Sequence, residues 1–321
     1  MNSVSHVGER NSDERNMKMT EALSSQLKKL GYKGRMVSIQ HLDDLKEEIG
    51  DYHSHGSFDE EFYKERLSRF TFGVPDSLPQ ARSLIVIAVP RPQIRVVFNW
   101  KGEKLFLIIP PTYVDNEEID RQVENLLRGV LSPKKYRVAK ALLPEKLLAV
   151  RSGLGSYGRN NICYVNGMGS FHQLVVFYTE LPCEEDNWQE SQLMESCEGC
   201  SACLDNCPTG AITPERFLLR AERCITFHNE RREDFPTWID PSWHKCIVGC
   251  LDCQAICPKN KNILEWIEEK GEFSQEETAL LLEGKMLNRL SSTLIIKLKQ
   301  LDLMEYLDVL PRNLSVLLDK E

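Results

Sequence analysis

The sequence of 321 residues predicts an α/β domain, then a small cysteine-rich module, then a short helical segment. Three observations support this order. Over residues 20–185, segments with apolar residues at helical spacing alternate with short apolar runs typical of strands, and this alternation favours layers of helix and sheet. Residues 190–262 hold most of the 11 cysteines. Residues 263–321 are leucine-rich with polar breaks, as expected of short helices that close a core.

The elements of the α/β domain follow from local signals. Thr20 can cap a helix that Gly31 ends. An apolar run at 84–89, between two prolines, predicts a strand buried on both faces, and Lys101-Gly102 predicts a hairpin turn. The expected helices are 20–30, 41–49, 59–70, 116–130 and 134–150, and the last of these is expected to restart at Pro144. The expected strands are 36–39, 84–89, 94–98, 104–109, 161–165 and 173–178.

Composition narrows the class of protein. Hydrophobic residues make up 41% of the chain, which suits a globular protein, and the net charge of −8 argues against a protein that coats nucleic acid. The polar segment 1–19 has no apolar core of a signal peptide and is expected to be a disordered tail. No apolar run is long enough to span a membrane, so we expect a cytoplasmic protein that does not bind membranes. In a reducing compartment, so many cysteines indicate metal or redox chemistry rather than disulfides.

The cysteines form two related motifs. The first is the bacterial ferredoxin pattern, in which the fourth cysteine, followed by proline, serves the other cluster. The second repeats the last three cysteines of that pattern. This predicts two 4Fe–4S clusters. The first would be bound by Cys197, Cys200, Cys203 and Cys257, and the second by Cys207, Cys250, Cys253 and one further cysteine.

The further ligand is Cys224 or Cys246. Cys246 precedes Cys250 by one residue too many for the pattern, whereas Cys224 lies on a separate segment that is free to fold in, so the spacing favours Cys224. Structural zinc held by four thiolates is the alternative, but zinc sites do not need the interleaved pattern twice. Cys163 and Cys183 are expected to be small buried residues.

A glycine-rich stretch, 153–158, matches the dinucleotide-binding pattern of three glycines. That pattern requires a strand before it and a helix after it, and here the helical segment comes first and the strand follows. NAD binding is therefore disfavoured. The stretch predicts either a tight turn or a close approach of the backbone to a flat ligand, which only glycine permits.

Several stretches resemble one family, the epoxyqueuosine reductases, which are corrinoid-dependent iron–sulfur enzymes of queuosine-tRNA maturation. Residues 153–159 resemble that family's GLGxxGK segment, and residues 223–226 resemble its RCIS segment. The resemblance covers about residues 55–320 and is most specific within 150–260. The other matching stretches are 81–86, 169–171, 179–182, 197–212, 249–260 and 312–314.

The resemblance implies an α/β corrinoid-binding domain like that of reductive dehalogenases, beside a ferredoxin-like module. It implies that Cys224 is a ligand of the second cluster, that cobalamin is a further cofactor, and that an external donor such as flavodoxin or ferredoxin supplies electrons. The substrate would be tRNA. The residues expected to contact the corrin are Gly153, Leu154, Gly155, Gly158 and Ser170.

The sequence also departs from the family's pattern. Counting back from Gly153 places Ala139 where the family has its catalytic aspartate, and alanine cannot exchange a proton. Val176 stands where a glutamate is usual, and no helical-repeat extension for tRNA is evident. Residues that could replace the acid are Tyr157, Lys140, Tyr136 and His172.

Three hypotheses remain at this point. The first is a corrinoid-linked iron–sulfur reductase of the epoxyqueuosine-reductase type with an unidentified substrate. The second is tRNA epoxyqueuosine reductase itself. The third is a ferredoxin-like electron carrier, or a reductive activator of a partner corrinoid protein.

Overall fold

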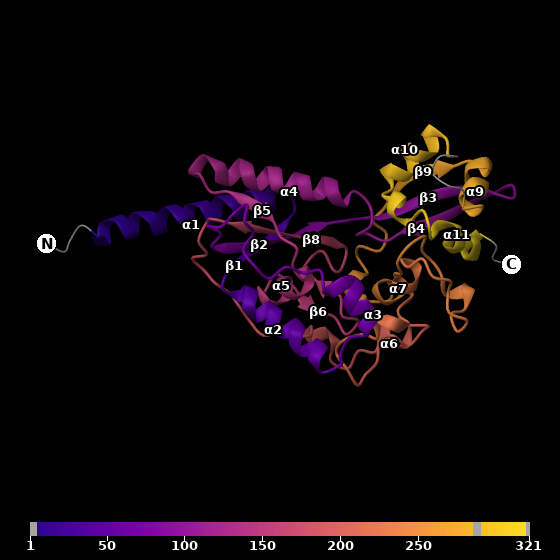
Figure 1. Ribbon diagram of the computed structural model, residues 1–321, viewed down its shortest axis with the longest axis horizontal. Coiled ribbons are helices and arrows are strands. Elements are labelled where there is room, and N and C mark those ends of the chain that lie inside the picture. The colour runs from indigo at the N-terminus through magenta and orange to yellow at the C-terminus, as the bar shows by residue number, and fades with distance from the viewer. Residues whose placement is uncertain (1–4, 285–289, 319–321) are drawn as a thin grey trace.

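The computed structural model describes residues 5–284 and 290–318 (Figure 1). A helix-covered sheet forms one part of the molecule, and a second sheet with the C-terminal helices forms another (Figure 1). Loops and short helices that carry the cysteines lie between and below them in this view. No helix among the described residues combines the length and apolar character needed to cross a bilayer.

The first sheet is antiparallel and has four strands in the order β1-β2-β8-β5. The strands are β1 (Lys33–Ser38), β2 (Ser83–Pro90), β8 (His172–Thr179) and β5 (Val138–Lys140). β2 is buried along nearly its whole length, which confirms the strand expected from the apolar run. Because successive side chains of a strand point to opposite faces, β2 contributes to two separate cores.

Helices cover both faces of this sheet (Figure 1). On one face lie α1 (Ser5–Lys29) and α4 (Asn116–Leu131), whose apolar side chains pack on Ile85 and Val175. On the other face lie α2 (His41–Ser54) and α5 (Glu145–Arg151), which pack on Leu84 and Val176. The result is the layered α/β arrangement that the alternating sequence pattern predicted.

The second sheet joins segments far apart in the sequence. The hairpin of β3 (Gln93–Trp100) and β4 (Glu103–Ile109) forms as expected, and Lys101 and Gly102 at its turn both have positive φ, of 51° and 83°. β3 then pairs in parallel with β9 (Ile267–Phe273). A hydrophobic core lies between this sheet and the last helices, and all three strands contribute side chains to it. The helices are α9 (Gln275–Leu282), α10 (Ser292–Gln300) and α11 (Leu310–Leu318).

Several expected elements differ in the structure. The helix expected at 134–150 is wrong in its first half, because β5 pairs there with the edge of β8 and the helix starts only after Pro144. The first helix does not begin at Thr20. It already runs from Ser5, and the Thr20 hydroxyl donates to the Asn16 carbonyl inside it, so most of the expected disordered tail is helical.

Two further elements are shorter than expected. The helix expected at 59–70 consists of α3 (Glu60–Phe62) and a π-helical turn, Tyr63–Leu67. The strand expected at 161–165 is reduced to β7 (Cys163–Tyr164), which pairs with β6 (Ser156–Tyr157). The expected helices 41–49 and 116–130 are confirmed by α2 and α4.

The cysteine-rich module contains little regular structure. Its helices are α6 (Ala202–Asp205), α7 (Ile225–Asn229) and α8 (Asp252–Ala255), each about one turn long. α6 and α8 are the corresponding turns of the two cysteine motifs, and the Asn206 side-chain amide donates to the Asp252 carbonyl across them at 3.0 Å. All 11 cysteines are free thiols, so the module has no disulfide framework.

Candidate functional site

Four cysteines surround a small cavity of about 50 Å³. They come from the first motif and from the end of the second, which the fold brings together: Cys197, Cys200, Cys203 and Cys257. The Arg159 guanidinium donates to the Cys197 and Cys200 carbonyls at 2.9 and 3.1 Å. The glycine-rich loop therefore fixes the backbone around this cavity.

Four other cysteines surround a second cavity of about 70 Å³: Cys207, Cys224, Cys250 and Cys253. Cys224 directly precedes α7, and hydrogen bonds from the Thr226 backbone and side chain favour its thiolate, although burial raises the pKa of the Cys224 thiol. Burial also raises the pKa of Cys250 and Cys253. Metal binding at such thiols releases protons, so loading is expected to be pH-dependent.

Cys246 lies outside both cavities. It is buried in an apolar cluster with Phe171 and Leu251, and burial raises the pKa of its thiol to about 12. Cys163 is buried as expected. Cys183 is only partly buried, and its thiol donates to the Met36 carbonyl.

The two cysteine cavities share a wall. The Asn160 side chain lines both of them and donates to the Tyr164 hydroxyl at 3.0 Å and to the Cys253 carbonyl at 3.3 Å. Among the described residues, no group of three or more His, Cys, Asp or Glu is arranged to hold a single metal ion. The thiols instead surround spaces, which suits a multi-iron cluster better than the tight tetrahedron of a zinc site.

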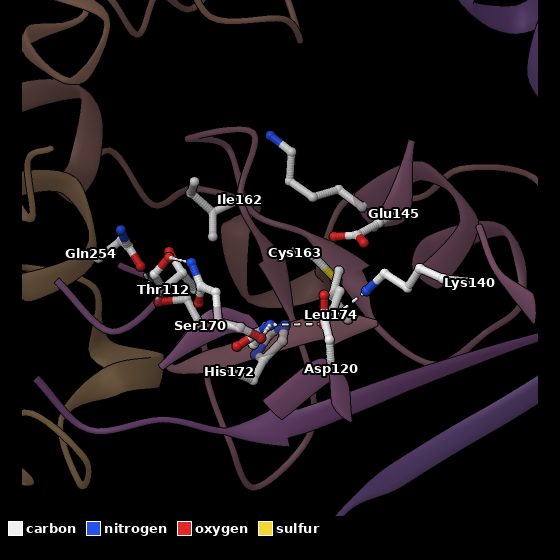
Figure 2. Close-up of a pocket in the computed structure, with 13 residues that line it drawn as sticks. Thr112, Asp120, Lys140, Glu145, Ile162, Cys163, Ser170, His172, Leu174 and Gln254 are labelled. Atoms are coloured by element: carbon white, nitrogen blue, oxygen red, sulfur yellow. Dashed lines mark hydrogen bonds and ion pairs between the residues drawn. The ribbon is translucent and has the colours of Figure 1, made fainter. Parts of the chain in front are cut away.

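A polar cavity of about 360 Å³ adjoins the second cysteine cavity (Figure 2). Ile162 and Gln254 line both, so the two spaces have a common wall. Gln254 and Ser170 lie at one side of the polar cavity in Figure 2, and Glu145 and Lys140 lie at the other. The remaining lining includes Thr112, Asn116, Asp120, Lys146, Cys163, His172, Gln173 and Leu174.

Within the described part of the chain, three buried polar atoms on residues that line this cavity have no hydrogen-bond partner. They are Asn116 Oδ1, Gln173 Oε1 and His172 Nδ1. Burial lowers the pKa of His172 to about 4, so the imidazole is neutral at physiological pH. Because buried polar groups are normally satisfied, three unsatisfied atoms on residues that line one cavity favour the binding of a polar ligand there.

Charged groups gather at the opposite wall. The Lys140 ammonium pairs with Asp120 at 2.7 Å, and Asp120 also accepts from the Gln173 amide at 3.2 Å. Burial raises the pKa of Glu145 to about 7. The next residue, Lys146, faces the cavities, and the surrounding protein lowers the pKa of its ammonium by desolvation.

An apolar cleft of about 310 Å³ continues from this wall, and Glu145 and Lys146 line both spaces. Its other walls are largely aromatic and aliphatic, from α2, α3, the start of α5 and the loop that precedes α7. The aromatic residues are Tyr52, Phe58, Phe62, Phe70, Tyr157 and Phe217. A polar cavity that opens into an apolar cleft suits a large ligand with both kinds of surface.

The glycine-rich loop packs against protein rather than against this cavity. A Cβ at Gly155 would lie 2.7 Å from Cys163 Sγ, and a Cβ at Gly158 would lie 2.6 Å from the Tyr164 ring. Gly153 has a φ of +71°, and Leu154 is part of the core. Close packing of the loop on β7 therefore explains why glycine is needed at Gly155 and Gly158.

Ser170 is the one residue of the five expected to contact a corrin that lines the polar cavity. Its hydroxyl donates to Gln254 at 2.8 Å and accepts from the Asn260 amide at 2.8 Å. A Cβ at Gly169 would lie 2.2 Å from Asn260 Oδ1. The second cysteine motif thus holds this segment in place.

The expected replacement acids are separated by the fold. Lys140 and His172 line the polar cavity, and Tyr157 lines the apolar cleft. Tyr136 lies elsewhere, with its hydroxyl bonded to Asn16 at 2.7 Å. Ala139 lies in β5 and packs against the first core without lining either space.

Sequence reasoning missed two carboxylates at the cavity, Asp120 and Glu145. Glu145 could have been noticed in the sequence, because it follows Pro144 at the start of a helix whose residues 147–150 are buried. Asp120 carried none, since α4 has an acidic face along most of its length.

Comparison with known proteins now adds to this geometry. Residues 196–260 match the family model of a 4Fe-4S double cluster binding domain. An epoxyqueuosine reductase from Staphylococcus aureus is 29% identical over 69% of this chain and 59% of its own length. One from Pseudomonas aeruginosa is 34% identical over 44% of this chain and 39% of its own length. The chain thus matches less than two thirds of either relative.

The fold agrees with these sequence matches. The Bacillus subtilis epoxyqueuosine reductase structure has a TM-score of 0.67 and 24% identity, covering 94% of this chain and 82% of that one. The chain is thus similar to epoxyqueuosine reductases in sequence and in fold. A structure of epoxyqueuosine reductase with an epoxyqueuosine-modified tRNA-Tyr stem loop has a TM-score of 0.69 and 23% identity, covering 94% of this chain and 81% of that one.

These findings confirm the mixed α/β fold with a double-cluster ferredoxin-like domain. Residues 196–260 thus match a domain that binds two 4Fe–4S clusters, and the curated relatives are reductases. The curated relatives are epoxyqueuosine reductases, which agrees better with the second of the three sequence hypotheses than with the first or the third.

Proposed function

We propose that this protein is a tRNA epoxyqueuosine reductase that takes electrons from an external donor, such as a flavodoxin or ferredoxin. The observation that carries the proposal is the series of shared walls. Asn160 joins the two cysteine cavities, and Ile162 and Gln254 join the second of them to the polar cavity. Adjoining cavities of this kind provide a short route for electrons from the cysteine-rich module to a site that can bind substrate.

The cysteine ligands in this proposal follow the two cavities. Cys197, Cys200, Cys203 and Cys257 hold one 4Fe–4S cluster, and Cys207, Cys224, Cys250 and Cys253 hold the other. When bound, the clusters supply one-electron relays. Hydrogen bonds from Arg159 and Asn160 to the cysteine-bearing backbone keep both sites at a fixed separation.

The polar cavity and the apolar cleft fit a corrinoid in the chemistry of their walls. A corrin macrocycle is apolar on its faces and carries amide side chains around its rim. The unpartnered Asn116 Oδ1 and Gln173 Oε1 can accept from such amides, and Ser170 lies across the same cavity. When bound, a corrinoid supplies a cobalt centre that can be reduced to Co(I) and passes electrons to the substrate.

Support for the substrate comes from the relatives. Their shared name, and the tRNA stem loop present in one similar structure, make epoxyqueuosine in tRNA the first substrate to test. The aromatic side chains of the apolar cleft suit a flat ring.

Anaerobic reconstitution tests the proposal. The full-length protein is loaded with iron and sulfide, mixed with cobalamin and a strong reductant, and incubated with tRNA that contains epoxyqueuosine. We expect a change in the cobalamin visible spectrum and nucleosides that have lost one oxygen by mass spectrometry. Cys246→Ala, which alters neither cavity, is the matched control and should behave as the unchanged protein.

Two results would contradict the proposal. If the clusters load and become reduced but the cobalamin spectrum stays unchanged and no oxygen is lost, the protein is an electron carrier or an activator of a partner. If cobalamin binds and is reduced but the tRNA is unchanged, the substrate assignment is wrong.

A further inference from the structure

Glu145 occupies the junction of the polar cavity and the apolar cleft. It is the first residue of α5 and follows Pro144, so the helix start fixes its backbone. It lines both spaces, and in Figure 2 it lies on the same wall as Lys140. A ligand that extends from one space into the other would therefore lie close to this side chain.

Neighbouring charged side chains such as Lys140 and Asp120 form an ion pair, whereas the Glu145 carboxyl group, among the described residues, does not take part in one. Lys140 is the nearest candidate cation, but its ammonium pairs with Asp120 at 2.7 Å, as the dashed line in Figure 2 shows. Within residues 5–284 and 290–318, no hydrogen bond or ion pair to the Glu145 carboxylate is found. A carboxyl group that is desolvated and unpaired favours its neutral, protonated form.

The charged groups that face Glu145 act in opposite directions. Burial raises its pKa to about 7, Lys140 on β5 and Arg69 lower it, and Asp120 on α4 raises it. Lys146 follows on the same helix and is itself desolvated. The other ionisable residues of the apolar cleft are Glu48, Tyr52 and Tyr157.

We propose that Glu145 is the proton donor of the reaction, giving its carboxyl hydrogen to the oxygen that leaves the substrate. This proposal rests on the proposed function. It assigns the acid role to a residue that begins α5, whereas counting back along the sequence from Gly153 leads to Ala139.

The reaction balances with this assignment. Removing an epoxide oxygen breaks two carbon–oxygen bonds, forms a carbon–carbon double bond and releases water, and it consumes two electrons and two protons. The external donor supplies the electrons. Glu145 gives one proton to the epoxide oxygen as the first carbon–oxygen bond opens. It then takes a second proton from bulk solvent and gives it to the same oxygen as the second bond breaks, so that the oxygen leaves as water.

The other groups at the cavity are less suited to this role. The Asp120 carboxyl group is already paired with the Lys140 ammonium and accepts a hydrogen bond from the Gln173 amide. His172 is a neutral imidazole at physiological pH, because burial lowers its pKa to about 4, and a neutral imidazole is a far weaker acid than a carboxyl group. Burial raises the pKa of Tyr157 far above its ordinary value, so that phenol is a weak acid in this environment.

The first test compares Glu145→Gln, Glu145→Asp and Glu118→Gln in the cluster-loaded, cobalamin-supplemented protein. Glu118 is an exposed carboxylate on α4 and serves as the control. We expect Glu145→Gln to lose on the order of 100-fold or more in single-turnover rate, as for other general acids. Iron content and the cobalamin spectrum should not change. Glu145→Asp should restore part of the rate, and Glu118→Gln should keep all of it.

The pH profile adds a readout that a merely structural role would not move. The rate of the unchanged protein should fall above pH about 7, because Glu145 then loses its proton. The same fall should be absent from the residual rate of Glu145→Gln. Full activity of Glu145→Gln, or the same fall with pH in that variant, would overturn the proposal.

Infrared difference spectroscopy separates this proposal from the proposed function. In the cluster-loaded protein without substrate, the band of a protonated carboxyl group should persist to about pH 7 and be missing in Glu145→Gln. If the protein fails to reduce epoxyqueuosine in tRNA, the proposed function fails, but this band still supports a Glu145 carboxyl group that is protonated and able to donate a proton. A band already lost near pH 5 would show an ordinary carboxylate and overturn the inference.

Discussion

Replacing Cys224 and Cys246 separately with alanine tests the ligand set most directly. Cys224 lines the same cavity as Cys207, Cys250 and Cys253, whereas Cys246 packs against Phe171 and Leu251. The two cysteines lie in the same module and differ only in their surroundings. Each variant is therefore the control for the other.

The expected magnitudes follow from these surroundings. Two 4Fe–4S clusters contain about eight iron atoms per chain. Cys224→Ala removes one of four ligands of the second site and should leave about four iron atoms, with the first site intact. Cys246→Ala removes only a buried sulfur, so it should keep about eight iron atoms and cost about 1 kcal/mol of stability.

The assay is anaerobic reconstitution followed by chemical determination of iron and sulfide. Electron paramagnetic resonance of the reduced protein gives a second readout, because two neighbouring reduced clusters broaden one another's signals. That broadening should disappear in Cys224→Ala and remain in Cys246→Ala. About eight iron atoms in Cys224→Ala together with about four in Cys246→Ala would refute the assignment.

Two further predictions concern the segments around the sites. Gly169→Ala combines a positive φ of 54° with a Cβ placed 2.2 Å from Asn260 Oδ1, so it should lose about 2–5 kcal/mol of stability in thermal unfolding. Gly56→Ala has similar backbone strain (φ 64°) in open space and should lose about 1–2 kcal/mol; equal losses would contradict the packing argument. Lys146→Gln removes a positive charge that interacts with the Cys224 and Cys253 sulfurs, so the reduction potential of the second cluster should become more negative. Redox titration of the unchanged and variant proteins measures this, and an unchanged or more positive potential would count against it.

Short-range patterns in the sequence correctly predicted many of the helices and strands. The buried strand β2, the β3–β4 hairpin and the helices α2 and α4 depend on neighbouring residues, such as the apolar run of β2 or the Lys101-Gly102 turn. Pro144 also marked a true helix start. The prediction from local propensity was wrong where pairing with a distant strand decided the structure. The residues of β5 have a helical pattern in the sequence, but they form a strand because they pair with β8.

The cysteine motifs by themselves determined that the chain has two cluster sites, because a cubane requires thiolates at closely spaced positions along the chain. Spacing favoured Cys224 over Cys246 without deciding between them, since either can approach by folding. Only the tertiary structure places one in a cysteine cavity and the other in an apolar cluster. The polar cavity likewise depends on distant segments: Asp120, Glu145 and Gln254 come from three separate parts of the chain, and desolvation by the whole fold, which no local pattern encodes, raises the pKa of Glu145.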